Sequence, residues 1–301
     1  MNILLTGGTG FIGTELLKHL SPHKVVVLTR NIEKAQKKLS SNNSGNITFI
    51  NSLNQYIHFD EFDAIINLAG EPITGKRWSR EQKEKICNSR WTITEKLVEL
   101  IHASANPPSI FISGSAVGYY GDQQNNLIDE SLQINDQGFT YHVCSKWESI
   151  ALQAQSQKTR VCTIRTGLVL GLGGGALPMM LPPFKFAAGS QLGNGKQYMP
   201  WIHLLDMVRG IIFLLQTPNA QGAFNVCSEH PVTNKEFSKI LAATVNRPLF
   251  LVTPKWVFNI AMGEASCLLF DSIRARPIHL LELGFKLTYP KLQPALQNLL
   301  Q

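Results

Sequence analysis

The chain has 301 residues, of which 44% are hydrophobic and 16% are charged, and its formal net charge is +7. This composition excludes an intrinsically disordered protein, and the short apolar run from Gly210 to Leu215 is too brief to cross a bilayer, so we expect no membrane partner. The basic residues are scattered, which favours a phosphate-bearing small molecule over nucleic acid as the anionic partner.

The 5 cysteines are widely spaced and do not match the spacing of metal ligands, so we expect no metal site. They are predicted to be buried free thiols in a reducing compartment. The first residues lead directly into an apolar run and glycines rather than into a signal peptide. Together these features predict a cytoplasmic protein.

Short apolar runs alternate with longer amphipathic segments through the first half of the chain. Strands are expected at residues 3–6, 25–29, 47–50, 64–68, 110–113 and 161–166, and helices at 11–20, 79–103 and 139–155. This alternation predicts an α/β fold of the Rossmann type, a doubly wound parallel sheet with helices on both faces.

The character of the sequence changes after residue 170. Residues 171–200 are rich in Gly and Pro and show little periodicity, which predicts a long functional loop or lid. We therefore expect a nucleotide-binding domain at 1–170 with a returning segment at about 201–230. Residues 171–200 and 231–301 are expected to form a smaller, mostly helical C-terminal substrate region, with a turn at Gly284-Phe285.

The clearest motif is the run from Gly7 to Gly13, which follows the first predicted strand and opens the first predicted helix. Its glycines stand at 7, 10 and 13, where they allow a tight turn, a close approach to a pyrophosphate and close packing of helix on sheet. The helix dipole and free N–H groups then face the anion. The turn predicts a dinucleotide site that includes Gly7, Thr9, Gly10, Phe11, Ile12 and Gly13.

The end of the second predicted strand indicates which dinucleotide binds. It carries Arg30 and shows no carboxylate before Glu33, whereas a carboxylate is usual where NAD is held by its ribose hydroxyls. An arginine fork suits the 2′-phosphate of NADP. The sequence therefore predicts NADP, with NAD as the less favoured cofactor. The alternative is that Arg30 is a surface residue that caps the strand.

Further segments resemble the extended short-chain dehydrogenase/reductase superfamily. The segments similar to this superfamily are Asn67–Gly70, Ser113–Gly121, Arg165–Gly171 and the Trp201–Asp206 box. One poorly characterised "epimerase family" branch is resembled by Glu71–Ile73, Arg77-Trp78, Ser89-Arg90, Cys144 with Trp147-Glu148, and Leu283–Phe285. The resemblance implies further cofactor contacts at Leu68, Ala69, Gly70, Ser113, Arg165, Gly167 and Leu168. Superfamily members often dimerise through helices on one sheet face, which implies a possible homodimer.

The superfamily's acid–base dyad, Tyr-x-x-x-Lys, is missing. Tyr141 and Lys146 are five apart, and residues at i and i+5 do not share a helix face. Alignment on Glu148 instead puts Thr140 and Cys144 in the tyrosine and lysine places. The sequence therefore predicts an intact cofactor site without the usual machinery for proton transfer.

Replacement groups can still be proposed from the sequence. Ser115 and Tyr141 are the candidate catalytic residues, and the candidate substrate-binding residues are Arg77, Trp78, Tyr119, Tyr120, Trp201 and His203. Packing or capping roles are the alternatives for these side chains. A purely structural use of the fold is a third alternative, which any clear NADP affinity would exclude, and two main functions remain open. One is an NADP-dependent oxidoreductase or epimerase-like enzyme acting on a small, sugar-like or anionic substrate. The other is a non-catalytic NADP-binding sensor or adaptor.

Overall fold

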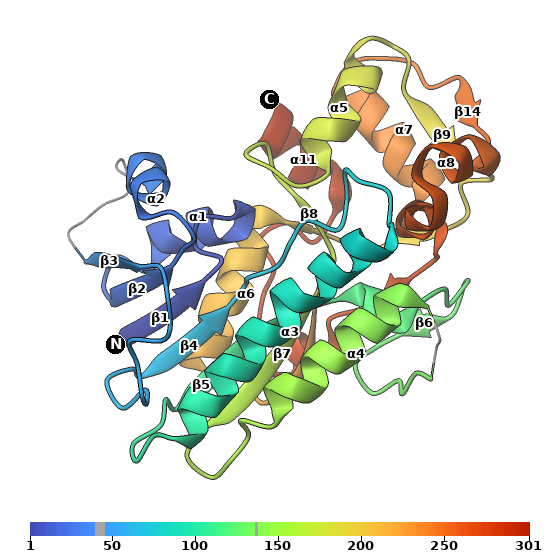
Figure 1. Cartoon of the computed structure of the whole chain (residues 1–301). Helices are drawn as coiled ribbons and strands as arrows, with labels where there is room; N and C mark the ends of the chain where they lie inside the picture. The colour runs from blue at the N-terminus through green and yellow to red at the C-terminus, as the bar shows by residue number, and fades with distance from the viewer. Residues whose placement is uncertain (40–45, 136–137) are drawn as a thin grey trace.

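A computed structural model describes residues 1–39, 46–135 and 138–301. Its centre is a seven-stranded sheet in which all neighbouring strands are parallel (Figure 1). In spatial order the strands are β12 (Gly222–Val226), β7 (Arg160–Thr166), β5 (Ile110–Ala116), β4 (Ala64–Asn67), β1 (Asn2–Thr6), β2 (Lys24–Leu28) and β3 (Ile47–Ile50). The strand order reverses between β1 and β4, and this is the place where ligands bind in such sheets.

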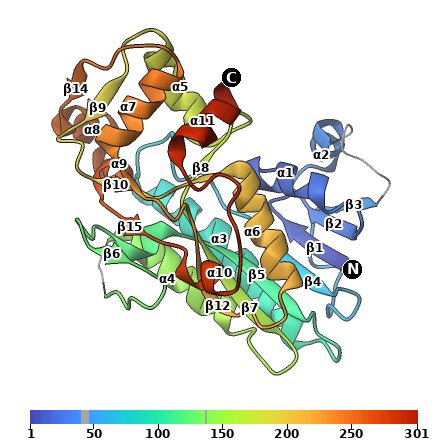
Figure 2. The same ribbon diagram turned by 180° about the vertical axis from the view of Figure 1, so that it is seen from behind.

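Helices cover both faces of the sheet, as the alternation of elements predicts (Figures 1 and 2). One face carries α1 (Phe11–His19), α2 (Ile32–Leu39) and α6 (Leu204–Gln216), and the other carries α3 (Arg80–His102) and α4 (Phe139–Leu152). Ser79 caps α3 by accepting a hydrogen bond from the Gln82 N–H at 3.2 Å. The Rossmann-type doubly wound sheet is therefore confirmed.

The remaining elements form a smaller lobe and the connections to it. They are η2 (Val117–Tyr120), β6 (Leu127–Ile128), β8 (Leu168–Leu170), α5 (Leu177–Lys185), β9 (Ser190–Leu192), β10 (Tyr198–Met199), β11 (Trp201–His203), β13 (Val232–Thr233), α7 (Asn234–Thr244), β14 (Leu251–Thr253), α8 (Lys255–Met262), η3 (Gly263–Ser266), α9 (Cys267–Phe270), β15 (Arg274–Ala275), α10 (Ile278–Glu282) and α11 (Leu292–Leu300). The lobe has its own apolar core, in which Leu177 and Leu181 of α5 pack with Phe237 and Leu241 of α7 and Leu296 of α11.

The expectation of a long loop at 171–200 is wrong. Residues 177–185 form α5, because Leu177, Leu181 and Phe184 recur at helical spacing and are buried in the lobe core. A proline in the first turn is compatible with a helix, whereas Pro182 and Pro183 near its end hid the pattern. Tertiary burial outweighs the low helix propensity of this segment.

The chain leaves the sheet domain and returns to it twice. Residues 222–226 return as edge strand β12 beside β7. Later, Leu280 of α10 and Phe285 pack into the same core as α1 and α6, so part of the expected C-terminal region contacts the nucleotide-binding domain. Gly284 precedes Phe285 with a φ of +91°, a conformation that glycine adopts without strain, and this confirms the predicted turn.

Candidate functional site

The loop between β1 and α1 has a shape that only glycine fits at two positions. Gly7 has a φ of +69°, and a Cβ there would lie 2.5 Å from the carbonyl oxygen of Leu68. A Cβ at Gly13 would lie 2.3 Å from the Gly7 carbonyl oxygen. The first turn of α1 therefore packs directly on the loop, as a dinucleotide-binding turn requires.

The amino end of α1 directs backbone donors outward. Gly10 occupies the position before the helix in an extended conformation, and no side chain caps it there. The N–H groups of Phe11, Ile12 and Gly13 precede the first intrahelical hydrogen bond, which Thr14 donates to the Gly10 carbonyl oxygen at 2.9 Å. These donors at the positive end of the helix dipole fit a pyrophosphate.

The loop after β4 is attached to the same turn. The Thr6 hydroxyl donates to Asn67 Oδ1 at 2.6 Å and accepts from the Ala69 N–H at 3.2 Å. Residues 68–70 are therefore held beside the glycine turn, where the sequence places them as cofactor contacts. Ser113 is fully buried in β5, and Asn67 Nδ2 lies 3.5 Å from its hydroxyl oxygen, so Ser113 acts behind this loop rather than at its surface.

Positive side chains border the turn. Arg30 follows β2, is exposed, and has no hydrogen-bond or ion-pair partner among the described residues. Lys38 of α2 reaches back over the turn, and its Nζ donates to the Thr9 carbonyl oxygen at 2.8 Å. Lys38 was not among the site residues predicted from the sequence. The available signal was its position on the helix that follows β2, together with the density of lysines there.

A second glycine-rich segment closes over the start of α1. Cβ atoms at Gly171, Gly174 and Gly175 would each lie 2.8–3.0 Å from the Phe11 side chain. The Phe11 ring is therefore enclosed by the chain that follows β8, whereas its backbone N–H belongs to the turn. Gly167 is equally constrained, since its Cβ would lie 2.5 Å from the Pro200 carbonyl oxygen. These glycines bring the first residues of the 171–200 segment to the cofactor end of the sheet.

A buried network of charged and polar groups occupies the corner formed by β5, β7 and α4. The Ser115 hydroxyl donates to Glu148 Oε1 at 2.6 Å. The Arg165 guanidinium binds both oxygens of Glu148, at 2.9 and 2.8 Å, and donates to the Tyr120 hydroxyl at 2.9 Å. The Tyr120 hydroxyl donates in turn to Asn225 Oδ1 at 2.8 Å. Candidate residues from three predicted roles therefore belong to one network.

The network holds its charges in fixed states. Burial alone would lower the pKa of Arg165, but the hydrogen bonds and charge of Glu148 outweigh this effect and raise it. Burial raises the pKa of Tyr120 to about 12. Arg165 therefore stays charged and Tyr120 stays neutral throughout the physiological range, so neither supplies a proton carrier near pH 7.

The helix face that carries the superfamily dyad carries Thr140 and Cys144 here. A Cβ at Gly118 would lie 3.1 Å from Thr140 Cβ, which places Thr140 against η2. Cys144 is buried beside Ser115, and burial raises the pKa of its thiol to about 12. Tyr141 instead donates to the Ile134 carbonyl oxygen at 2.9 Å. Lys146 Nζ lies 4.1 Å from the centroid of the Trp91 ring on α3. Tyr141 and Lys146 therefore do not form a dyad.

The two tyrosines after β5 differ in accessibility. Tyr120 has no exposed surface, so it cannot contact a substrate in this conformation. Tyr119 is half-buried, and the Arg165 guanidinium lies 3.6 Å from its ring centroid. Its ring centroid also lies 5.5 Å from that of Tyr141. Tyr119 and Tyr141 are therefore the two tyrosines beside this corner that a substrate could contact.

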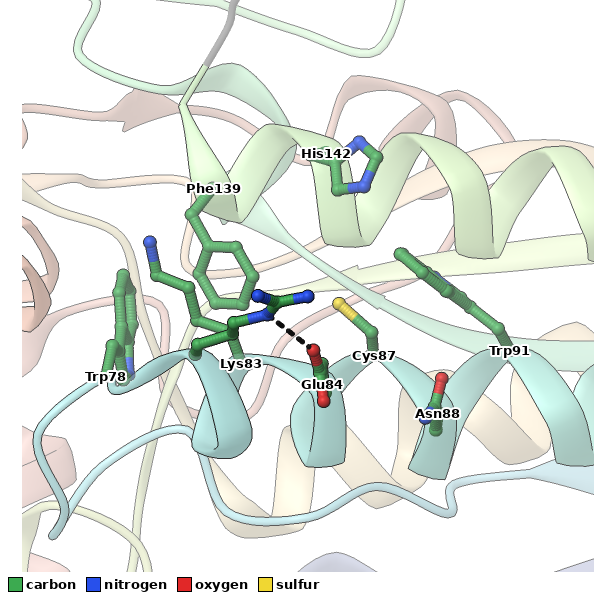
Figure 3. A pocket seen from close by; sticks show the side chains of 9 residues that line it. Trp78, Lys83, Glu84, Cys87, Asn88, Trp91, Phe139 and His142 are labelled. Carbon is green, nitrogen blue, oxygen red and sulfur yellow. Dashed lines mark hydrogen bonds and ion pairs between the residues drawn. The ribbon is translucent and has the colours of Figure 1, made fainter.

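Arg77 and Trp78 precede α3. Arg77 is exposed, and its Nη2 lies 3.2 Å from the Cβ position of Gly263, so it faces the smaller lobe. Trp78 donates to the Ile73 carbonyl oxygen at 2.9 Å and stacks edge-on against Phe139. It lines a groove between α3 and α4 that also carries Lys83, Glu84, Cys87, Asn88, Trp91 and His142 (Figure 3). Since α1 lies on the opposite face of the sheet, this groove is separate from the glycine turn.

The Trp201–Asp206 box is interior. Trp201 has no exposed surface, and His203 caps α6 by accepting from the Leu205 N–H at 3.0 Å. Burial lowers the pKa of His203. Asp206 accepts from the N–H groups of Thr288 and Tyr289 at 2.7 and 2.8 Å. Trp201 and His203 reach no surface from which to contact a substrate, so we do not carry them into the proposed site.

The described residues contain neither a metal-binding cluster nor a helix that could span a membrane. No group of three or more His, Cys, Asp or Glu side chains there could hold a metal ion. The five cysteines are free thiols, and all but the half-buried Cys267 are buried, in line with the sequence expectation. Within 1–39, 46–135 and 138–301, no helix has the length and apolarity needed to cross a membrane.

Comparisons with known proteins agree with this architecture. Residues 3–227 match the NAD dependent epimerase/dehydratase family, and residues 253–299 match a domain of unknown function, DUF1731. The chain is 35% identical to "Epimerase family protein SDR39U1 homolog, chloroplastic" of Arabidopsis thaliana, covering all of this chain and 87% of the relative. It is 34% identical to "Epimerase family protein YfhF" of Bacillus subtilis, covering 100% and 98% of the two chains.

A solved structure of human epimerase family protein SDR39U1 with NADPH has a TM-score of 0.87 to this chain at 28% identity, covering 99% of both chains. UDP-glucuronic acid 4-epimerase from Bacillus cereus, solved with NAD, has a TM-score of 0.77 at 16% identity over 99% of this chain and 95% of that one, a likeness of fold alone. The glycine turn, the sheet order and these matches show that the chain belongs to the NAD-dependent epimerase/dehydratase family.

Proposed function

We propose that the chain binds NADPH, with the pyrophosphate on the amino end of α1 and the 2′-phosphate beside Arg30. The observation that carries this proposal is the uncapped glycine turn with two cations, Arg30 and Lys38, on the neighbouring segment. An arginine fork pairs with phosphate oxygens, and no carboxylate stands at the end of β2 to bind ribose hydroxyls. The NADPH in the human relative supports the same choice.

We propose further that the bound cofactor serves an oxidoreductase or epimerase-like reaction on a small, sugar-like or anionic substrate. NADPH supplies a hydride to a substrate carbon, and its oxidised form accepts one. Ser115 lies at the carboxyl end of β5, and its hydroxyl hydrogen is committed to Glu148. Its oxygen keeps a lone pair for a substrate hydroxyl, but Ser115 is only 5% exposed, so a substrate would reach it only if the corner moved. The half-buried Tyr119 and Tyr141 supply aromatic surface beside it.

Proton transfer in such a reaction would not depend on a group that titrates near neutrality. Burial raises the pKa values of Cys144 and Tyr120, each to about 12, and raises that of Tyr119. Activity between pH 6 and 8 is then expected to vary little, unlike activity that relies on a Tyr–Lys dyad. Neutral hydroxyl groups would orient the substrate oxygen, and solvent would exchange the proton.

A second candidate function is a non-catalytic NADPH-binding sensor or adaptor. The observation that favours it is that Ser115, Glu148 and Arg165 hydrogen-bond to one another, so that the corner is held in one geometry. In this case NADPH binding itself would be the signal.

Turnover measurements separate the two functions. Purified protein would be incubated with NADPH and a panel of carbonyl compounds, and with nucleotide sugars for epimerisation. The wild type, Ser115→Ala and a control variant, Ser156→Ala, would be compared, since Ser156 is exposed in the turn before β7 and has no contact with the site. Substrate-dependent turnover that falls at least tenfold in Ser115→Ala alone supports catalysis. Tight NADPH binding without turnover on any substrate supports the sensor. Failure to bind NADPH would overturn both candidates.

A further inference from the structure

Most of the molecule's net positive charge lies in the smaller lobe, because acidic residues are scarce there. Residues 171–200 and 231–262 contain Lys185, Lys196, Lys235, Lys239, Arg247 and Lys255 but only one acidic residue, Glu236. They therefore carry +5 of the chain's formal net charge of +7. The Glu236 carboxylate is engaged by the N–H and hydroxyl of Thr233 in the capping box of α7.

Exposed apolar side chains gather in the same two stretches. They supply eight of the twelve large hydrophobic side chains that are exposed among the described residues. Phe186 is 84% exposed, Phe250 80% and Val252 57%. Trp256 and Ile260, one helical turn apart, project from α8, a helix with no buried residue. Burial of such groups in an apolar environment is favourable, and a clustered apolar surface indicates a contact site.

Hydrogen bonds and strand pairing bring these basic and apolar residues together. Arg247 Nε donates to the Lys185 carbonyl oxygen at 2.9 Å, which places the Lys185–Phe186 segment beside the end of α7. β14, which carries Val252, pairs with β9. One shallow groove is lined by Lys235, Lys239 and Arg247 together with Phe250 and Val252. We call Lys185, Phe186, Lys235, Lys239, Arg247, Phe250 and Val252 the lobe surface.

We propose that the lobe surface docks the protein on an anionic lipid membrane. Phenylalanine side chains that project into solvent beside lysine and arginine match an interface in which rings enter the acyl boundary and cations meet headgroup phosphates. Phe186 and Phe250 are almost fully exposed beside Lys185, Lys235, Lys239 and Arg247, and this pairing of rings with cations favours an anionic lipid surface. This contact is peripheral, so it revises the expectation of no membrane partner, which rested only on the lack of an apolar run long enough to cross a bilayer.

The surface lies away from the cofactor turn. In Figures 1 and 2, β9, β14 and α8 stand at the far side of the smaller lobe from α2 and β3. Docking there would leave the amino end of α1 open to solvent. We therefore expect membrane binding not to require NADPH, so binding can be measured without the cofactor.

The test is sedimentation of the full chain with vesicles of phosphatidylcholine alone or of phosphatidylcholine with an equal amount of phosphatidylglycerol. We expect binding to the anionic vesicles only, weakening as salt is raised because the charges are exposed. Lys235→Ala and Lys239→Ala should each lower the partition coefficient about fivefold. Phe250→Ser should lower it by a similar or larger factor without changing the salt dependence.

Matched variants on the sheet domain provide the control. Ile57 is 80% exposed, like Phe250, and Lys24 is an exposed lysine on β2, so Ile57→Ser and Lys24→Ala should bind as the wild type does. Circular dichroism and thermal unfolding check that each variant is folded. Absence of binding to anionic vesicles at low salt would overturn the proposal, as would equal losses in the control variants. Binding to polyglutamate without binding to vesicles would also overturn it, and would assign the surface to an acidic protein partner.

Discussion

The carboxyl edge of the sheet has two halves that treat their polar groups in opposite ways. Around β1 and β2, the donors face outward: the first N–H groups of α1 are uncapped, and Arg30 has no partner among the described residues. Around β5 and β7, Ser115, Glu148 and Arg165 bind one another in the interior. The first half is suited to a ligand that comes and goes, whereas the second maintains a fixed geometry.

A fold of this family can therefore hold an open ligand-binding half beside a half whose polar groups are paired in the interior. Removing a group from the first half should affect mainly cofactor affinity, because few protein contacts depend on it. Removing a group from the second half should affect mainly stability, because it leaves a buried charge without a partner.

The largest effect is expected in the β5–β7 half. Glu148→Ala leaves the Arg165 guanidinium buried without its counter-charge and should lower the free energy of unfolding by about 3–5 kcal/mol. Urea unfolding measures this loss. The double variant Glu148→Leu/Arg165→Met removes both charges and should be less destabilised than Glu148→Ala. If Glu148→Ala lowered the free energy of unfolding by less than about 1 kcal/mol, the ion pair would behave as a solvent-exposed one. The two halves of the sheet edge would then not differ as described.

The next effect concerns the turn. Gly13→Ala puts a Cβ 2.3 Å from the Gly7 carbonyl oxygen, so the helix must move and NADPH affinity should fall by about 100-fold or more. Calorimetric titration gives the affinity. Gly173→Ala is the control, because no atom lies within 4 Å of its Cβ position. Equal affinities for Gly13→Ala and the wild type would show that the turn does not carry the cofactor.

A smaller effect is expected at Lys38. Its ammonium lies on the Thr9 carbonyl oxygen and can move to a phosphate, so Lys38→Ala should weaken NADPH binding about tenfold and NADH binding less. The control is Lys24→Ala, a change of the same type at the amino end of β2, which should leave both affinities unchanged. A loss of the same size for the two cofactors would place Lys38 on the pyrophosphate instead.

The smallest effect is a pH dependence of stability from His203. Burial lowers its pKa in the folded state from an ordinary value of 6.5, so the unfolded chain binds the proton more readily. Stability is therefore fully present above pH 6.5 and declines as the pH falls below it, by at most about 1.4 kcal/mol per pH unit. His203→Asn keeps a capping side chain and should reduce the change in the free energy of unfolding between pH 7 and pH 5, as measured by urea unfolding. An unchanged pH dependence of this free energy would show that His203 does not contribute.

Much of the nucleotide-binding half could be predicted from the sequence, because its causes are local. Glycines at 7 and 13, and Arg30 after an apolar strand, act at the positions where they stand in the chain. The β5–β7 half could not be predicted in the same way. Ser115, Glu148 and Arg165 are distant in sequence, and their pairing arises only when β5, β7 and α4 pack. Helix α5 was missed for a related reason, since its prolines hide a pattern that burial enforces.

Calorimetric titration of the protein with NADPH and with NADH, repeated on Arg30→Ala, tests most directly whether Arg30 binds the 2′-phosphate. We expect tight NADPH binding, weaker NADH binding, and a loss of that preference by about 10- to 100-fold in the variant, as for a charged hydrogen bond to phosphate. Equal affinity of the wild type for the two cofactors, or an unchanged preference in Arg30→Ala, would contradict this role of Arg30.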